Sequence, residues 1–195
     1  MITDINQLDF NKKYTYSDYL TWRFQERVEL IKGKLFKMTP APKRQHQRVS
    51  ADLQFNMMKS LAGNSCQLYN APFDVRLPSE DEHGNKIASV VQPDICVVCD
   101  ESKLDDAGCI GAPDLIVEII SKSSSKKDID YKFNLYQEHG VLEYWIVYPA
   151  EGIVDQFILS NSRFELHKKL SSEDVINSES IEALEVDLND VFKDN

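Results

Sequence analysis

The sequence has no apolar run that approaches the roughly 18–20 residues of a membrane-spanning helix. The first residues, Met1-Ile2-Thr3-Asp4, lack the basic region and following apolar stretch of a secretory signal. Internal repeats, linkers and low-complexity tracts are also missing. These absences predict a cytoplasmic protein that does not associate with membranes. The 195 residues, 42% of them hydrophobic and 28% charged, suit a single domain over residues 1–195.

Cysteine is sparse, with four residues at positions 66, 96, 99 and 109. Cys96 and Cys99 have the spacing of a zinc-binding pair, but they lie within a predicted strand. Residues three apart on a strand point to opposite faces, so these two thiols cannot converge on one metal ion. Because no second pair or histidine cluster accompanies them, we expect all four cysteines to be buried and reduced.

The net charge of −10 is unevenly distributed. The acidic C-terminal segment, from about residue 171, holds eight acids and one lysine, whereas residues 30–51 hold six basic residues and no acid. A polyanion could therefore dock on the basic stretch, and Lys43, Arg44, His46 and Arg48 are its candidate nucleic-acid-binding residues. The alternative is that these side chains form an ordinary solvated surface.

Hydrophobic periodicity and turn residues predict alternating helices and strands. The expected elements are a capped helix at 15–22, a hairpin of 28–31 with 34–38, a helix from 46 to about 61, a strand at 73–77, a surface loop at 78–89 turning at 83–85, strands at 90–98 and 114–120, a helix at 125–139, a strand at 142–147, and a hairpin of 153–159 with 163–168. This order predicts one α/β domain whose helices pack on a central mixed sheet, extended by the last hairpin.

The most informative stretch is the apolar run that follows Gly111-Ala112-Pro113 and holds Glu118 at its centre. Such a run reads as a strand buried on both faces, where a carboxylate must be paired, metal-bound or protonated. Asp94 lies 24 residues earlier in a similar apolar strand. If the two strands pair, the two acids approach each other, and like charges at that distance need a cation. Oxygen ligands of this kind suit Mg²⁺ or Mn²⁺.

Lys132, on the helix that follows, could supply a fixed positive charge to the same place. Each of these residues also has a purely structural interpretation. Asp94 follows a proline, as Asp114 does, and aspartate in that context often satisfies backbone groups. Lys132 could pair with Asp128 one helical turn away.

Several motifs taken together resemble the Uma2 family of restriction-endonuclease-like proteins. They are Glu29–Leu35, Thr39–Pro42 followed by His46-Gln47, Gln92–Ile95, Gly111–Ser121, the helical trio Asp128, Lys132 and Tyr136, Gly140-Val141, and Glu143–Val147. The resemblance runs from about Tyr16 to Glu165. It implies the PD-(D/E)XK nuclease fold, that is, a restriction-endonuclease-like α/β core.

The resemblance also implies roles for individual residues. Asp94 and Glu118 would be metal-binding catalytic acids, Glu29 a supporting acid and Lys132 the catalytic lysine. The wider superfamily places its lysine two residues after the second acid, where this sequence has Ile120, and Lys122 is the rival of Lys132. The implied activity is Mg²⁺-dependent hydrolysis of DNA by an endonuclease, with a homodimer expected by analogy. The alternative is a non-catalytic nucleic-acid or protein-binding module that retains the fold.

Overall fold

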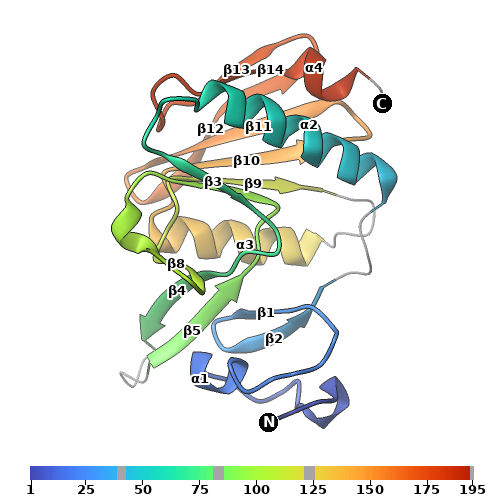
Figure 1. The fold of residues 1–195 in the computed structure, drawn as a ribbon, viewed down its shortest axis with the longest axis vertical. Helices are drawn as coiled ribbons and strands as arrows, with labels where there is room; N and C mark the ends of the chain where they lie inside the picture. Colours follow the sequence, from blue (N-terminus) through green and yellow to red (C-terminus); the bar gives the residue numbers. More distant parts are fainter. Residues whose placement is uncertain (39–42, 81–85, 121–125, 194–195) are drawn as a thin grey trace.

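Two six-stranded mixed sheets form the frame of the protein in a computed structural model that describes residues 1–38, 43–80, 86–120 and 126–193 (Figure 1). The central sheet has the order β12-β11-β10-β9-β6-β3. Its strands are β3 (Gln67–Asn70), β6 (Ile95–Val98), β9 (Leu115–Ile119), β10 (Glu143–Tyr148), β11 (Ile153–Ser160) and β12 (Arg163–Ser171). The second sheet has the order β2-β1-β5-β4-β8-β7. Its strands are β1 (Val28–Ile31), β2 (Lys34–Lys37), β4 (Val75–Glu80), β5 (Lys86–Val91), β7 (Leu104–Asp105) and β8 (Gly108–Ile110).

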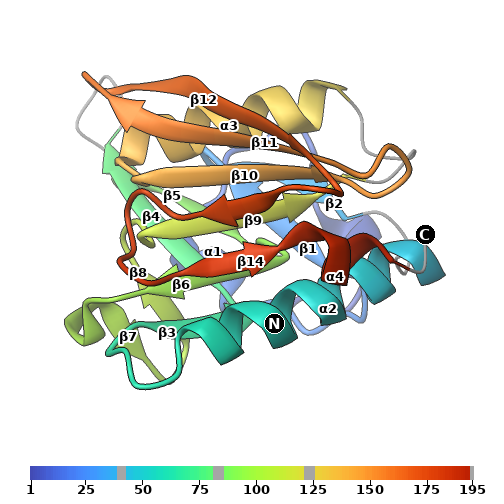
Figure 2. The ribbon, with the colours of Figure 1, turned by 90° about the horizontal axis from the view of Figure 1, so that it is seen from above.

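Different elements cover the two faces of the central sheet (Figure 2). One face carries the long helix α2 (Arg44–Ser60), the hairpin β13 (Val175–Asn177) with β14 (Glu185–Asp187), and α4 (Leu188–Phe192). The other face packs against α3 (Lys126–His139) and the second sheet. The remaining short helices are η1 (Ile5–Gln7), α1 (Tyr16–Tyr19) and η2 (Glu101–Lys103). The predicted α/β fold with a mixed sheet flanked by helices is confirmed, with a second sheet that the pattern did not reveal.

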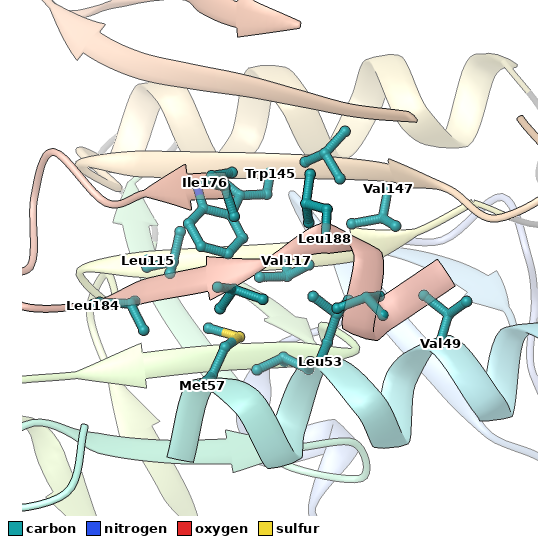
Figure 3. Close-up of a cluster of buried hydrophobic side chains, with 14 of the residues drawn as sticks. Val49, Leu53, Met57, Leu115, Val117, Trp145, Val147, Ile176, Leu184 and Leu188 are labelled. Atoms are coloured by element: carbon teal, nitrogen blue, oxygen red, sulfur yellow. The ribbon is translucent and has the colours of Figure 1, made fainter. Parts of the chain in front are cut away.

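The core beneath α2 follows from the four-residue spacing of its apolar side chains (Figure 3). Val49, Leu53 and Met57 are fully buried and pack in one cluster with Val117 and Trp145 of the central sheet. Each buried aliphatic side chain of this size contributes about 1.5–3 kcal/mol relative to an exposed one. This cluster fixes α2 on the sheet and thereby fixes the position of its first turn.

Local sequence signals placed most elements correctly. The β1–β2 hairpin turns at Lys32 and Gly33, both with positive φ (51° and 77°), as a glycine at the turn predicts. Thr15 and Asp18 form the capping box of α1. Helix α2 begins at Arg44, two residues before the predicted start, and α3 ends at His139 before Gly140.

Two predicted elements between residues 78 and 98, a loop and a strand, are wrong. The predicted loop 78–89 is largely strand, because β4 continues to Glu80 and pairs with β5 from Lys86 onward. The predicted turn at 83–85 lies outside the described residues. The predicted strand 90–98 is two strands in different sheets, β5 and β6, separated by Gln92-Pro93-Asp94. Pro93 cannot donate a ladder hydrogen bond, and the chain changes sheets there.

The acidic C-terminal segment is folded onto the core through its apolar residues, which include Ile176, Leu184 and Val186. A buried carboxylate, Glu143 at the start of β10, holds the beginning of this segment. It accepts hydrogen bonds from Trp145 Nε1, Gln156 Nε2, Ser178 Oγ, the backbone amides of Glu179 and Ser180, and Ser180 Oγ, at 2.6–3.0 Å. Six donors satisfy this charge without a cation, so its role is structural.

The prediction of four reduced thiols is wrong for two of them. Cys96 and Cys109 are free and buried as expected, but Cys66 and Cys99 form a disulfide. Strand β3 pairs antiparallel with β6 so that Gln67 lies opposite Val98. Cys66, which precedes Gln67, therefore faces Cys99, which follows Val98. Cys96 and Cys99 do lie in the cores on opposite faces of the central sheet, as the strand period predicts. Among the described helices, none is long and apolar enough to cross a membrane.

Candidate active site

Asp94 and Glu118 are brought together by the antiparallel pairing of β6 with β9. Ile95 pairs with Val117, so the residue before Ile95 faces the residue after Val117. Asp94 Oδ2 accepts a 2.8 Å hydrogen bond from the backbone amide of Ile119, which ties the carboxylate to the end of β9. The condition for their approach, that the two strands pair, is therefore met.

Glu118 is buried and engaged through one of its oxygens. Its Oε1 accepts hydrogen bonds from Lys132 Nζ at 2.9 Å and from the hydroxyl of Tyr136 at 2.7 Å. Lys132 and Tyr136 are four residues apart, so they project from the same face of α3 toward the strand. Apolar packing of Leu135 and Tyr136 against Ile116 and Tyr144 holds that face in place.

Glu29 joins the cluster from β1 of the second sheet. Its Oε1 lies 2.9 Å from Lys132 Nζ and accepts a 2.8 Å hydrogen bond from the backbone amide of Gln92. Lys132 therefore bridges two carboxylates from different sheets. The side chain of Asp128, its alternative partner, lies outside the described residues, as does Lys122.

His46 lies in the cluster rather than on the open surface. Its Nε2 is 3.2 Å from Asp94 Oδ2, and 11% of its side chain is exposed. The other three predicted nucleic-acid-binding residues, Lys43, Arg44 and Arg48, are exposed around the first turns of α2, where Arg48 forms an ion pair of 2.8 Å with Asp52. The packing of α2 thus delivers one basic residue to the acids and leaves three facing outward.

Burial and like charge dominate the electrostatics of this cluster. Burial raises the pKa of Glu118 to about 7, with Lys132 opposing the shift and the charges of Asp94 and Glu29 adding to it. Burial alone would lower the pKa of Lys132, but Glu118 and Glu29 raise it overall. For His46 too, burial acts to lower the pKa, and the hydrogen bond to Asp94 with the nearby carboxylates raises it overall. Three carboxylates face one lysine, so the site has an excess of negative charge.

This arrangement fits a hard divalent cation. Asp94 Oδ1 and Glu118 Oε2 have no hydrogen-bond partner among the described residues, while the other oxygen of each carboxylate is held by protein donors. Within the described part of the chain, no three His, Cys, Asp or Glu side chains form a complete metal-binding group. Mg²⁺ commonly takes one or two carboxylates and completes its shell with water and phosphate oxygens, so two carboxylates with free oxygens suffice.

Two supporting contacts were not assigned from the sequence. Tyr136 was noted for its spacing from Lys132, but its hydrogen bond to Glu118 depends on how α3 docks on the sheet. Gln92 acts through its backbone amide on Glu29, which no side-chain pattern could indicate. Asp114 accepts from the amide of Cys99 at 2.7 Å, which is the backbone-capping role expected for it.

The mixed sheets, with an acidic pair on neighbouring strands facing a helical lysine, place this protein in the class of nuclease-fold α/β proteins. The chain belongs to the Uma2 family, whose model, described as "Putative restriction endonuclease", matches residues 16–189. An uncharacterized protein of Synechocystis sp., slr1290, is 24% identical over 143 residues, covering 72% of this chain and 71% of that protein.

A solved structure shares the fold. The crystal structure of a "putative nuclease belonging to DUF820" from Anabaena variabilis superimposes with a TM-score of 0.69 at 18% sequence identity, covering 92% of this chain and 98% of that one. The resemblance to Uma2 that the motifs carried is thereby confirmed at the level of family and fold.

Proposed function

We propose that this protein is a Mg²⁺- or Mn²⁺-dependent endonuclease that hydrolyses phosphodiester bonds in DNA, with Asp94, Glu118, Lys132 and Glu29 as its catalytic group. The observation that carries the proposal is the convergence of Asp94 and Glu118, each with one oxygen uncommitted, beside the ammonium group of Lys132. A bound divalent cation would polarise the scissile phosphate and lower the pKa of an attacking water. Asp94 and Glu118 would hold it.

The other residues prepare this site. Tyr136 fixes Glu118 through Oε1, so that Oε2 is the oxygen left for the cation. Glu29 holds Lys132 Nζ against Glu118, and a fixed ammonium group there offsets negative charge that develops on the phosphate in the transition state. His46 restrains Asp94 from the side of α2.

DNA is the proposed substrate because exposed basic side chains lie at the start of α2, the helix that brings His46 to Asp94. Lys43 and Arg44 are exposed at the start of α2, two to three residues before His46, and Arg48 follows one half-turn later. Positive charges on the same helix would position a polyanionic backbone without reading its sequence.

The decisive experiment measures nicking and linearisation of supercoiled plasmid by purified protein in Mg²⁺, in Mn²⁺ and in EDTA. Asp94→Asn should abolish metal-dependent cleavage and leave the fold intact, because an asparagine oxygen can still accept the amide of Ile119. Asp114→Asn is the matched control, since Asp114 shares the Pro-Asp context but caps Cys99 away from the cluster. Undiminished cleavage by Asp94→Asn protein that is free of contaminating nuclease would reject the assignment.

The alternative, a binding module without turnover, has one observation in its favour. Lys132 bridges acids from both sheets, and this contact would be kept for stability alone. Gel-shift and cleavage assays on the same DNA separate the two functions. Binding without any metal-dependent cleavage, by protein that is folded and metal-loaded, would favour the binding module.

A further inference from the structure

Gln92 is the first residue after β5, where the chain leaves the second sheet for the central sheet. Val91, the last residue of β5, lies opposite Val75, the first residue of β4, so Gln92 and Asp74 come next to each other beyond the ends of the two strands. Nε2 of Gln92 donates a 2.8 Å hydrogen bond to Oδ1 of Asp74. The side chain of Gln92 is therefore bound to the second sheet at the point where the backbone leaves it.

The oxygen of the same side-chain amide is held by Arg27, which lies directly before β1. Arg27 donates to Gln92 Oε1 from Nε at 3.1 Å and from a terminal guanidinium nitrogen at 2.7 Å. Both ends of the Gln92 amide are thus engaged by residues from separate parts of the chain. We call this arrangement the Gln92 clamp, and it holds the side chain in one orientation.

Asp74, one side of the clamp, is itself fixed by two further elements. Its backbone carbonyl accepts a 2.9 Å hydrogen bond from the amide of Cys109 on β8, and its Oδ1 accepts from the hydroxyl of Tyr19 on α1 at 3.4 Å. A Cβ at Gly108 would overlap the Asp74 carbonyl, so glycine lets β8 approach this closely. The clamp is therefore anchored in a well-connected part of the second sheet.

The backbone amide of Gln92 belongs to the candidate active site. It donates at 2.8 Å to Oε1 of Glu29, and the same oxygen lies 2.9 Å from Lys132 Nζ. Figure 1 shows helix α3, which carries Lys132, between the central sheet and the second sheet. The place of the Glu29 oxygen, and with it the partner of the lysine, depends on where the Gln92 amide lies.

We propose that Gln92 is a positioning residue for the ammonium group of Lys132. Its clamped side chain fixes its backbone amide, the amide fixes Oε1 of Glu29, and that oxygen sets where the ammonium group lies. The clamp also adds to the stability of the second sheet, so the test must read out the lysine itself. The effect on DNA cleavage rests on the proposed function, whereas the effect on the lysine can be measured without DNA or metal.

A swap of hydrogen-bonding groups tests the clamp. Gln92→Glu places a carboxylate oxygen against Asp74 Oδ1 and should break the clamp by like-charge repulsion. Asp74→Asn alone keeps an oxygen that can accept from Gln92, and combined with Gln92→Glu it supplies an amide donor to the new carboxylate. The combined variant has the net charge of the wild-type protein, so recovery in it reports the hydrogen bond. Gln92→Leu removes the clamp without adding a charge.

The direct readout is the ¹⁵N signal of the Lys132 ammonium group in lysine-labelled protein in EDTA, assigned with Lys132→Arg. This side chain is 14% exposed and lies between two carboxylates, which slows proton exchange with water. Gln92→Glu and Gln92→Leu should shift the signal, and the combination of Gln92→Glu with Asp74→Asn should restore it. Gln67→Ala, which removes a glutamine bound to the Tyr69 hydroxyl on β3, should leave the signal unchanged.

An unchanged Lys132 signal in both Gln92 single variants, or no recovery in the combined variant, overturns the proposal. If the Gln92 variants do not fold, Arg27→Ala decides, because Arg27 is exposed and lies outside the strands. It releases one side of the clamp and should shift the Lys132 signal by a smaller amount. An unchanged signal in that variant overturns the proposal as well.

Cleavage gives the functional readout. In Gln92→Leu, the single-turnover rate at saturating DNA should fall about 10–100-fold while the dissociation constant for DNA stays the same, because Lys132 acts on the transition state. A shifted lysine signal with an undiminished rate overturns the positioning role. Wild-type protein that does not cleave DNA refutes the proposed function alone, since the lysine signal still decides whether Gln92 places Lys132.

Discussion

Lys132 Nζ lies 2.9 Å from Glu29 Oε1, and this ion pair joins helix α3 to a strand of the second sheet. The same nitrogen is 2.9 Å from Glu118 Oε1 on the central sheet. When one glutamate is replaced by glutamine, the other can still form an ion pair with Lys132. The stability of single and double variants is therefore strongly non-additive.

Glu118→Gln should leave the unfolding free energy of the metal-free protein near neutral pH unchanged or raise it by roughly 0.5–2 kcal/mol. The change removes repulsion from Asp94 and Glu29 and leaves Lys132 with Glu29. The double variant with Glu29→Gln leaves the buried ammonium group without a carboxylate and should lose about 3–5 kcal/mol. Urea denaturation in EDTA measures both. A large loss in Glu118→Gln alone would make Glu118 a structural ion-pair member.

Mg²⁺ should raise the melting temperature of the wild-type protein and not that of Glu118→Gln. A ligand that binds only the native state stabilises it in proportion to the logarithm of its concentration over the dissociation constant. Differential scanning calorimetry with and without Mg²⁺ gives the comparison, with Glu173→Gln as an exposed acidic control. An equal metal response in all three proteins would remove Glu118 from the metal site.

The pH dependence of stability follows from the raised pKa of Glu118. Its pKa is about 7 in the folded protein and roughly 4.3 in an unfolded chain, so the native state binds more protons between these values. The unfolding free energy of the metal-free protein should therefore fall as pH rises from about 4.5 to 7, by an amount on the order of 3 kcal/mol at most. In the Glu118→Gln variant, the unfolding free energy should fall less over this pH range, because the contribution of Glu118 is removed. Denaturation curves across this range, compared with the Glu173→Gln control, provide the test.

Lys132→Ala should slow DNA cleavage by raising the activation free energy about 2–4 kcal/mol, the scale of one preorganised electrostatic group. We expect a much smaller effect from Lys122→Ala, because the ammonium group of Lys132 contacts Glu118 directly. Single-turnover rates on one oligonucleotide duplex rank the two variants. The opposite ranking would transfer the catalytic role to Lys122.

Glu143→Gln should destabilise the protein by about 2–4 kcal/mol, because the amide nitrogen cannot accept from the donors that converge on this carboxylate. The loss should appear in urea denaturation followed by tryptophan fluorescence, since Trp145 donates directly to Glu143. Glu173→Gln, exposed on the same C-terminal segment, should change little. Equal effects of the two changes would contradict the anchoring role of Glu143.

The sequence predicted those features that depend on local periodicity. Val49, Leu53 and Met57 identified the buried face of α2, and the apolar run around Glu118 identified the strand that carries the site. Features that depend on which strands pair could not be predicted. The Cys66–Cys99 disulfide needs the register of β3 with β6, and the contact of His46 with Asp94 needs the docking of α2.

The split of the predicted strand 90–98 has the same origin. Val90, Val91 and Ile95 are all apolar and β-branched, so a window of sequence cannot tell one strand from two. Only the tertiary structure shows that Val91 belongs to the second sheet and Ile95 to the central sheet. Because the chain changes sheets at this point, Asp94 lies directly before β6 in the central sheet.

The bridge that Lys132 makes between the two sheets has a consequence for how the family can diverge. A family member without catalytic activity would still lose stability if it replaced Lys132 or both of its glutamates, so selection for folding alone would preserve them. Asp94 is under no such restraint, because an asparagine in its place can still accept the amide of Ile119. In surveys of homologues, retention of an aspartate at position 94 would therefore be the more discriminating sign of a working enzyme than retention of the lysine.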